Sequence, residues 1–431
     1  MKRVTLVFPG QGSQYIGMGH DLYKKYDVAR KTFEEANDVL GFDLKKMCFE
    51  GDMNELTETK NTQPALLTTS VAAFRVYMKE YGMPPEFMMG HSIGEFSALT
   101  CSEVIKFADA LKIVRQRGIF MQEAVVPGVG EMTAISGINI NLIKEECEKI
   151  CNDIEKVGIA CYNSPNQIVI SGNTLAVKKV GEKFIRMGAN VTPLKVSAPF
   201  HSMLMQTASD KFEEELMKYT YSESLWPVVS NLTAEPYMNK AQVIKNLTLQ
   251  MIHPVRWYES MNYIQDKGAE IVLELGPKTV LKNLVKNNFK GIKAYSFDEN
   301  EDRKALGNEI GTIEKISKEL KMKILSKCMA SAVCICNRNW NNEEYCRGVV
   351  EPYNKIKKLY EELEASGKEP TIDNIKEALH MLKSVFTTKK APLEEKKERI
   401  NRLVKETGDK HLFEYWMDIE HDEKSAIDMV V

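Results

Sequence analysis

The chain has 431 residues, a length that suits two or three domains. Its hydrophobic content of 43%, charged content of 27% and formal net charge of −2 are those of an ordinary globular protein. This charge balance offers no global field to attract nucleic acid or an anionic membrane, and no run of about eighteen apolar residues predicts a membrane-spanning helix. We therefore expect no nucleic acid and no membrane among its partners.

The first third of the chain alternates short apolar runs with longer stretches of helical spacing. The opening run is β-branched and ends at Pro9, which predicts a buried first strand and not a signal peptide. A second short run ends at Gly90 and also predicts a strand. The expected elements are strands at 3–8 and 87–92 and helices at 62–80, 95–104 and 107–124.

A different rhythm occupies residues 128–196. Short strands and amphipathic helices follow one another in the order β-α-β-β-α-β, which is the ferredoxin-like split unit. We expect a small subdomain inserted into a larger one. Its predicted elements are strands at 131–137, 157–163, 166–172 and 190–196 and helices at 142–151 and 175–188.

Two more buried strands are expected at 226–231 and 269–275. Because strands and helices alternate throughout the larger part, a parallel or mostly parallel sheet covered on both faces is predicted. The fold class is therefore α/β, with residues 1–127 and 197–299 as the core around the insertion.

Beyond about residue 300 the strand pattern disappears. Apolar positions recur at helical spacing, with a capping residue at Thr371 and glycine stops at Gly367 and Gly408. Residues 300–431 are predicted to form a helical extension. Its three clearest helices are expected at 342–367, 371–386 and 392–408.

Nine cysteines are scattered along the chain, most of them within apolar patterns. An odd number without a secretory signal favours reduced thiols and a cytoplasmic protein. The four cysteines from Cys328 to Cys346 contain no C-x2-C pair, and "CMASAVCIC" (328–336) is typical of a buried helix. A metal site is therefore not favoured there.

The stretch "GHSIG" (90–94) places Ser92 in the pattern G-x-S-x-G, between a predicted strand and a predicted helix. In that setting the glycines allow a tight turn that exposes the hydroxyl, and the backbone N–H of Ile93 can face an oxyanion. A serine hydroxyl also needs a base in reach before it becomes a nucleophile. The pattern occurs often by chance, so an ordinary tight turn stays open at this point.

Among seven histidines, His201 in "SAPFHS" follows a predicted strand and a Pro-Phe turn and opens a new helix. It is a candidate base, although a histidine that bonds the backbone at a helix start would look the same. His91 adjoins the serine and can only shape the turn. From the residues alone, Arg117 could be a solvated helical arginine like Arg115.

Several motifs in order and at matching spacing give the chain a family resemblance. They include "VFPGQGSQYIGMG", "NTQPALLTTS", "GHSIGEFSAL", "RQRGIFMQEA", "NSPNQIVISG", "SAPFHS" and "ELGPKTVL". Over residues 1 to about 290 the chain resembles the malonyl-CoA:acyl-carrier-protein transacylases and the acyltransferase domains of polyketide synthases. The resemblance implies an α/β-hydrolase-like core with the ferredoxin-like insertion. It also implies transfer of malonyl from malonyl-CoA to the phosphopantetheine thiol of an acyl carrier protein through an acyl-serine, by a monomer without a cofactor.

The resemblance also assigns roles to single residues. Ser92 would be the nucleophile and His201 the base, with the ring held by a backbone carbonyl at Gln250. Gln11 and Ile93 would supply the oxyanion N–H groups. The remaining pocket positions are Arg117, which would bind the malonyl carboxylate, Phe200, whose bulk would disfavour a methyl branch, and the polar residues Gln63 and Asn163.

Three alternatives are weighed against this interpretation. "GQGSQYIGMG" is not favoured as a nucleotide loop, because it lacks the Lys-Ser/Thr of a P-loop and has Tyr15 where a dinucleotide fingerprint needs glycine. A hydrolase of the same fold, which clears acyl groups from carrier proteins, is the closest rival, and Arg117 argues against it. A docking role for the helical extension stays open, as does the choice between fatty acid and polyketide synthesis.

Overall fold

The computed structural model describes the chain in two compact units. The first contains residues 1–77 and 85–306, and the second contains 78–84 and 307–431. The residues described within them are 2–126, 128–152, 154–194, 196, 198–310 and 318–407. The predicted extension at 300–431 therefore includes two stretches, 311–317 and 408–431, that lie outside the described residues.

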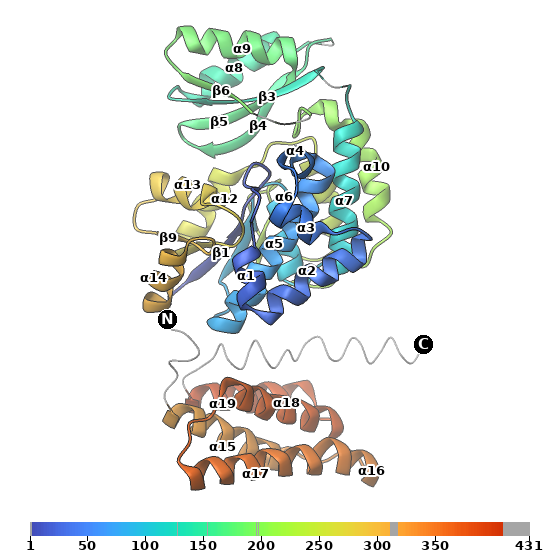
Figure 1. Ribbon diagram of the computed structural model, residues 1–431, viewed down its shortest axis with the longest axis vertical. Coiled ribbons are helices and arrows are strands. Elements are labelled where there is room, and N and C mark those ends of the chain that lie inside the picture. Colours follow the sequence, from blue (N-terminus) through green and yellow to red (C-terminus); the bar gives the residue numbers. More distant parts are fainter. Residues whose placement is uncertain are drawn as a thin grey trace. The chain divides into compact units, whose positions relative to one another are not determined.

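A parallel five-stranded sheet forms the centre of the first unit (Figure 1). Its strand order is β7-β2-β1-β8-β9, and every neighbouring pair is parallel. All five residues of β1 are buried, as expected for a strand that is covered on both faces. The strands are β1 (Val4–Phe8), β2 (Phe87–Gly90), β7 (Val228–Val229), β8 (Ile271–Glu274) and β9 (Lys293–Ser296).

Helices pack on both sides of this sheet. Helix α6 contacts β1 and β2, whereas α13 contacts β8 and β9. The mixed α/β class with a parallel sheet, predicted from the sequence, is confirmed. The helices are α1 (His20–Lys25), α2 (Asp27–Leu40), α3 (Leu44–Glu50), α4 (Met53–Thr57), α5 (Thr59–Glu80), α6 (Ile93–Cys101), α7 (Phe107–Glu123), α10 (Gln206–Leu216), α11 (Gln242–Gln250), α12 (Trp257–Asp266), α13 (Val280–Asn288) and α14 (Asn300–Ile310).

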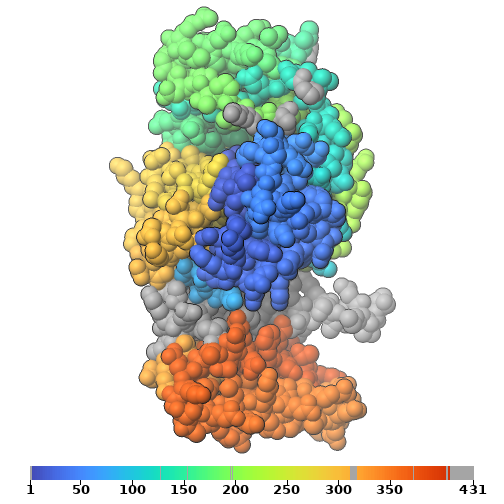
Figure 2. All heavy atoms as spheres, in the orientation of Figure 1, coloured from blue at the N-terminus to red at the C-terminus, as the bar shows by residue number. Residues whose placement is uncertain are grey.

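A second, antiparallel sheet of order β4-β5-β3-β6 lies in the same unit. Helices α8 and α9 cover its face turned away from β1 (Figure 1), and the assembly forms a distinct lobe (Figure 2). Strand β4 joins the core, because Tyr162 N–H donates to Val255 O at 2.9 Å and Val255 N–H donates to Ala160 O at 2.8 Å. The elements are β3 (Gly130–Ser136), α8 (Ile140–Ile150), β4 (Val157–Ser164), β5 (Gln167–Asn173), α9 (Thr174–Arg186) and β6 (Asn190–Pro193).

The described part of the second unit beyond residue 317 is helical. Its helices surround an apolar core that includes Leu325, Leu379 and Leu382, all fully buried. Thr371 caps α18 as predicted, since its hydroxyl accepts the Asn374 N–H at 3.2 Å. The helices are α15 (Lys318–Cys334), α16 (Asn342–Tyr345), the π-helical turn η3 (Cys346–Val350), α17 (Glu351–Ser366), α18 (Ile372–Thr388) and α19 (Leu393–Thr407).

Two expectations for this unit are corrected. The stretch 328–336 is not one buried helix, because α15 ends at Cys334 and both Cys334 and Cys336 are exposed. The ammonium of Lys389 donates to the carbonyls of Ala332 and Ile335 at 2.9 and 3.0 Å, which satisfies two carbonyls at the end of this helix.

The expected helix at 342–367 is interrupted by the π-turn at Gly348. A Cβ at Gly348 would lie 2.0 Å from Thr388 Oγ1, so the Thr388 side chain at the end of α18 occupies the space that a side chain at position 348 would need. Within the described residues, no helix is both long and apolar enough to cross a membrane.

Candidate active site

Ser92 occupies a strained turn between β2 and α6. Its φ of 53° and ψ of −111° are unusual for a residue with a side chain. The turn depends on glycine at both flanks: a Cβ at Gly90 would lie 2.0 Å from the Gly94 carbonyl carbon, and one at Gly94 would lie 2.1 Å from Phe8 O. The packing therefore forces Ser92 to the carboxyl edge of the sheet, at the N-terminus of a helix.

His201 lies within hydrogen-bond distance of the serine, although 109 positions separate them in the sequence. Its Nε2 is 2.8 Å from Ser92 Oγ, and its Nδ1 is 2.7 Å from the backbone carbonyl of Gln250. A carbonyl can only accept, so Nδ1 carries the proton and Nε2 offers a lone pair to the serine hydroxyl. Gln250 is the last residue of α11, where carbonyls lack intrahelical partners. The arrangement pairs a serine with an oriented base.

Burial keeps this histidine neutral. His201 is 4% exposed, and burial, followed by the nearby charge of Arg117, lowers its pKa to about 3. The residue has a φ of 56° and precedes the short helix η1 (Met203–Met205) instead of starting a helix itself. At neutral pH the ring is therefore a proton acceptor.

Arg117 is a buried cation beside the serine. It projects from α7 with 1% of its surface exposed, and its Nη2 lies 2.8 Å from Gln250 Oε1 and 3.5 Å from Ser92 Oγ. Its Nε–H makes no hydrogen bond within the described chain. Burial lowers the Arg117 pKa to about 9, while the charge of Glu95 opposes that shift. A guanidinium with an unused donor next to the hydroxyl is suited to an anionic group of a substrate.

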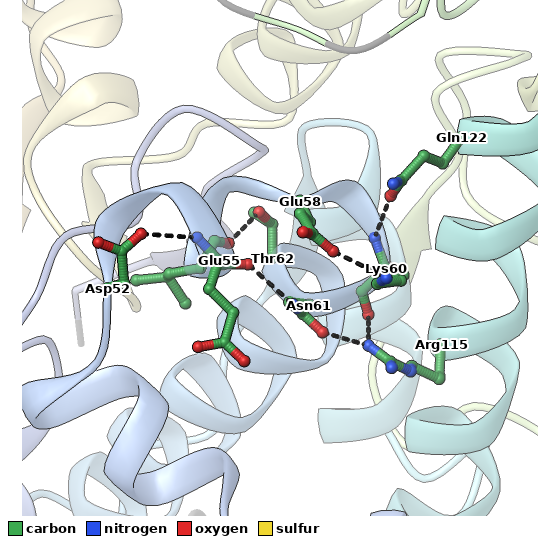
Figure 3. Close-up of polar contacts among 9 residues, drawn as sticks. Asp52, Glu55, Glu58, Lys60, Asn61, Thr62, Arg115 and Gln122 are labelled. Atoms are coloured by element: carbon green, nitrogen blue, oxygen red, sulfur yellow. Dashed lines mark hydrogen bonds and ion pairs between the residues drawn. The ribbon is translucent and has the colours of Figure 1, made fainter.

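Arg115 has a different role on the same helix. Its Nη1 donates to Lys60 O at 2.6 Å and to the side chain of Asn61, which ties α7 to the start of α5 (Figure 3). Gly118 permits the close contact, because a Cβ there would lie 2.6 Å from Lys60 Cα. Arg115 is therefore a structural link between helices and not the solvated counterpart that the sequence suggests.

Side-chain hydrogen bonds also hold the junction between α4 and α5. Asn61 Nδ2 donates to Glu55 O at 2.8 Å, Thr62 Oγ1 donates to Leu56 O at 2.6 Å, and Asp52 caps α4 (Figure 3). These bonds fix the start of α5, the helix that carries Gln63.

The two predicted oxyanion donors remain available. No hydrogen bond from the N–H of Gln11 or Ile93 is present in the described structure. Ile93 is the first residue of α6, so its N–H points out of the helix N-terminus. The side chain of Gln11 is held by Thr59, whose Oγ1 accepts from Nε2 at 3.2 Å.

The other predicted pocket residues differ in their contacts. Gln63 is buried, its Nε2 lies 3.4 Å from Met121 Sδ, and its Oε1 has no partner among the described residues. Asn163, on β4, contacts His91 instead of Ser92, with Oδ1 2.9 Å from Nε2. Phe200 is buried directly before His201.

Two residues of the site were not singled out from the sequence. Asn231 follows β7, accepts the Ser92 N–H at 2.8 Å and donates to Gly90 O at 2.6 Å. Glu95 is the one carboxylate in α6, a helix whose residues are all buried. An acid as the one charged residue of a helix whose other members are apolar or uncharged polar residues, and a polar residue at the carboxyl end of a parallel strand, are the signals that could have found them.

Neither the cavity found in the first unit nor any metal-binding group of the described residues suggests a different active site. A cavity of about 730 Å³ lies elsewhere in the first unit, between Val104, Tyr237 and Tyr263, and none of the predicted site residues lines it. In the described part of the chain, no three His, Cys, Asp or Glu side chains are grouped to hold a metal ion.

Comparison with known proteins agrees with the geometry. The acyl transferase domain family matches residues 5–310. A malonyl CoA-acyl carrier protein transacylase of Bacillus subtilis is 41% identical over 392 residues, which cover 91% of this chain and 98% of that protein. This match is longer than the family domain and so extends into the helical extension.

Two solved structures are similar to a large part of this chain. FabD from Acinetobacter baumannii superimposes with a TM-score of 0.69 at 38% identity and covers 72% of this chain and 98% of its own. A malonyl-transacylase in complex with a type II polyketide synthase acyl-carrier protein has a TM-score of 0.69 at 39% identity and covers 71% of this chain and 100% of its own.

Proposed function

The chain belongs to the acyl transferase domain family, and we propose that Ser92, His201 and Arg117 carry out its reaction. It is a malonyl-CoA:acyl carrier protein transacylase, which moves a malonyl group from malonyl-CoA to the thiol of an acyl carrier protein. One observation carries the residue assignment: a serine at 2.8 Å from a neutral imidazole has a buried guanidinium at 3.5 Å from the same oxygen.

The first half-reaction loads the serine. Ser92 Oγ attacks the thioester carbon of malonyl-CoA while His201 Nε2 takes its proton. The negative charge that develops on the thioester oxygen is met by the N–H groups of Gln11 and Ile93. The tetrahedral adduct collapses, the C–S bond breaks, and the CoA sulfur leaves with the proton that His201 returns.

The second half-reaction repeats these steps with a different thiol. The phosphopantetheine thiol of the carrier protein gives its proton to His201 Nε2 and attacks the malonyl-serine ester. The C–O bond breaks, and Ser92 regains its proton from the imidazolium. Throughout, the Gln250 carbonyl stabilises the ring while it is charged, and the nearby end of α11 adds a favourable dipole.

Arg117 supplies the preference for malonyl. Malonyl-CoA ends in a free carboxylate that can pair with the guanidinium, whereas acetyl-CoA leaves this buried cation without an anion. Phe200, beside His201, would crowd a methyl branch on the acyl chain. Gln63 would direct its unpartnered Oε1 into the pocket, and Asn163 would act through His91 on the turn that holds Ser92.

The finer architecture is also proposed. Residues 1–127 and 197–299 form an α/β-hydrolase-like core, 128–196 form a ferredoxin-like subdomain, and 300–431 form a helical extension. The parallel sheet and the sheet order β4-β5-β3-β6 with two helices support this division. We further propose that the reaction takes place in the cytoplasm. We also propose that it needs no cofactor, because the chain itself supplies the nucleophile, the base and the cation.

A labelling experiment tests the transfer. Enzyme is incubated with radiolabelled malonyl-CoA, with and without phosphopantetheinylated carrier protein, and the products are separated. Stable label on the carrier, dependent on Ser92, is expected. Free malonate as the main product in the presence of carrier would instead identify a hydrolase.

A further inference from the structure

The side chain of Gln250 joins two buried charges. Its Oε1 accepts from Arg117 Nη2 at 2.8 Å, and its Nε2 donates to Glu95 Oε2 at 2.6 Å and to Ser92 O at 3.1 Å. If the amide turned over, its oxygen would face the carboxylate and its NH2 group would face the guanidinium, so that both hydrogen bonds would be lost. The carboxylate of Glu95 therefore decides which end of the amide Arg117 meets.

Glu95 is itself fixed from two further directions. Its Oε1 accepts from the Tyr237 hydroxyl at 2.6 Å, and its Oε2 accepts from the Asn231 N–H at 3.2 Å. The side chain is fully buried, and no Lys, Arg or His in the described residues forms an ion pair with it. Burial raises its pKa, while Tyr237 and Gln250 oppose that shift. Burying a carboxylate costs free energy unless the carboxylate accepts hydrogen bonds from groups that it holds in place.

Arg117 needs such an orienting partner. The guanidinium lies over the ring of Phe96 at 5.2 Å, and its shorter side-chain hydrogen bond is the one to Gln250, at 2.8 Å against 3.5 Å to Ser92 Oγ, so Gln250 is the polar group that sets its position. A cation that must receive a carboxylate 3.5 Å from the nucleophile depends on its orientation, because a small displacement of a binding group lowers the rate substantially.

We propose that Glu95 is a positioning residue: through the amide of Gln250 it holds Arg117 where the carboxylate of the donor binds, and so supports selection of malonyl over neutral acyl groups. This inference rests on the proposed role of Arg117. The described partners of the serine hydroxyl are His201 and Arg117 and do not include Glu95. Its effect belongs to donor choice and not to the chemistry of acyl transfer.

Two substitutions separate positioning from mere packing. Glu95→Leu removes all acceptors, whereas Glu95→Gln can present its oxygen to Gln250 and its NH2 group to the Tyr237 hydroxyl. We expect kcat/KM for malonyl-CoA to fall about tenfold in Glu95→Leu, largely because KM rises. In Glu95→Gln we expect kcat/KM to return most of the way to the wild-type value. Acetyl transfer changes by less than about twofold in both, because acetyl does not engage Arg117.

A matched control uses another buried carboxylate. Glu274 on β8 accepts the N–H groups of Leu281 and Lys282 at 3.1 and 2.9 Å and contacts none of the site residues. Glu274→Gln should lower the melting temperature without changing the ratio of malonyl to acetyl transfer. Should Glu95→Leu not fold, Tyr237→Phe, which removes one donor to Glu95, should shift the same ratio by about threefold.

The closing experiment repeats both Glu95 substitutions in an Arg117→Ala background. If Glu95 acts through Arg117, they no longer change malonyl kcat/KM there. An equal loss with both acyl donors, or a loss that persists without Arg117, would overturn the positioning role. If Arg117→Ala itself left malonyl transfer unchanged, the carboxylate assignment in the proposed function would fail, and the Glu95 inference with it.

Discussion

The edge of the parallel sheet and the helical second unit differ in backbone strain and in how their buried groups are packed. At the sheet edge, Ser92 and His201 adopt positive φ values, and Arg117 and Glu95 are buried as charged groups. In the described second unit the helices pack a mainly aliphatic core, and the buried ammonium groups of Lys321 and Lys389 bond to a carboxylate and to backbone carbonyls. Its one positive-φ residue other than glycine, Lys390, lies in a turn after α18.

The difference shows that the sheet edge contains the features that lower the stability of the fold. Strained backbone and buried charge each cost free energy of about 1–3 kcal/mol or more, and a fold retains them when the surrounding packing enforces them. The glycines at positions 90 and 94 and the hydrogen bonds of Gln250 and Asn231 provide that enforcement. Changes at the sheet edge should therefore alter chemistry, whereas changes in the second unit should alter stability alone.

The largest expected effect comes from the serine and its base. Ser92→Ala or His201→Ala should lower malonyl transfer about 10,000-fold, because each removes part of the unit that makes the nucleophile. Single-turnover formation of malonyl-enzyme measures this loss. Ser209→Ala, which removes a buried hydroxyl bonded to Thr248 O at 2.8 Å, is the control and should leave transfer nearly unchanged. Full activity of Ser92→Ala would rule out the acyl-serine.

Arg117→Ala should reduce malonyl kcat/KM about 100-fold and improve acetyl transfer relative to malonyl, because the buried partner of the carboxylate is gone. The malonyl kcat/KM of Arg117→Lys should lie between the values of the wild type and of Arg117→Ala, since an ammonium keeps the charge but not the planar fork. Arg115→Ala is the matched control: it breaks the link to Lys60 and Asn61 and should lower stability without changing donor preference. An unchanged donor preference in Arg117→Ala would contradict the assignment of Arg117 as the carboxylate-binding residue.

In the helical unit, Leu379→Ala should lower the free energy of unfolding by about 2–5 kcal/mol, because it leaves a cavity in a fully buried apolar core. Chemical denaturation measures the change. Malonyl transfer by the folded protein should stay within about twofold of wild type. A large loss of kcat without loss of folded protein would show that this unit takes part in catalysis.

A smaller effect is expected at the start of α18. Thr371→Ala removes the side chain that accepts the Asn374 N–H and should lower the free energy of unfolding by about 1 kcal/mol. Thr371→Ser keeps the hydroxyl and serves as the control. Equal stability of the Ala and Ser variants would mean that the cap contributes nothing.

The pH dependence of serine labelling should be almost flat on the acid side. Because the folded pKa of His201 is lowered from 6.5 to about 3, the neutral base is present above that value and is lost only as pH falls through it. Labelling of Ser92 by a neutral sulfonyl fluoride avoids substrate charge. Its rate should change little between about pH 8 and 5, whereas an ordinary histidine would lower the rate markedly below about pH 6.5. A drop centred near 6.5 would contradict the burial argument.

The sequence predicts much of the fold because local patterns determine its elements. Continuous apolar runs predict β1 and β2, and helical spacing predicts α5 and α7, all of which are present. Strand β9 was missed, since "KAYS" is short and only alternate residues are buried at this edge of the sheet. The π-turn at Gly348 was not predicted, and the side chain that packs against this glycine, Thr388, is distant in sequence.

The site is predicted less completely. Family motifs drew attention to Ser92, His201, Arg117 and the Gln250 carbonyl, and the structure brings these four together. The side chain of Gln250 and its contact with Glu95 could not be predicted. Their effect arises from tertiary hydrogen bonds between α6 and α11, whose residues are 155 positions apart.

The most direct measurement is a competition for the serine. The enzyme is mixed briefly with equal concentrations of malonyl-CoA and acetyl-CoA, quenched in acid and digested. The mass of the peptide that contains Ser92 is then measured by mass spectrometry. We expect malonyl on that peptide in large excess over acetyl, and its disappearance when carrier protein is added before the quench. Acyl groups on another residue would contradict Ser92 as the nucleophile. Equal amounts of malonyl and acetyl on Ser92 would contradict Arg117 as the residue that binds the malonyl carboxylate.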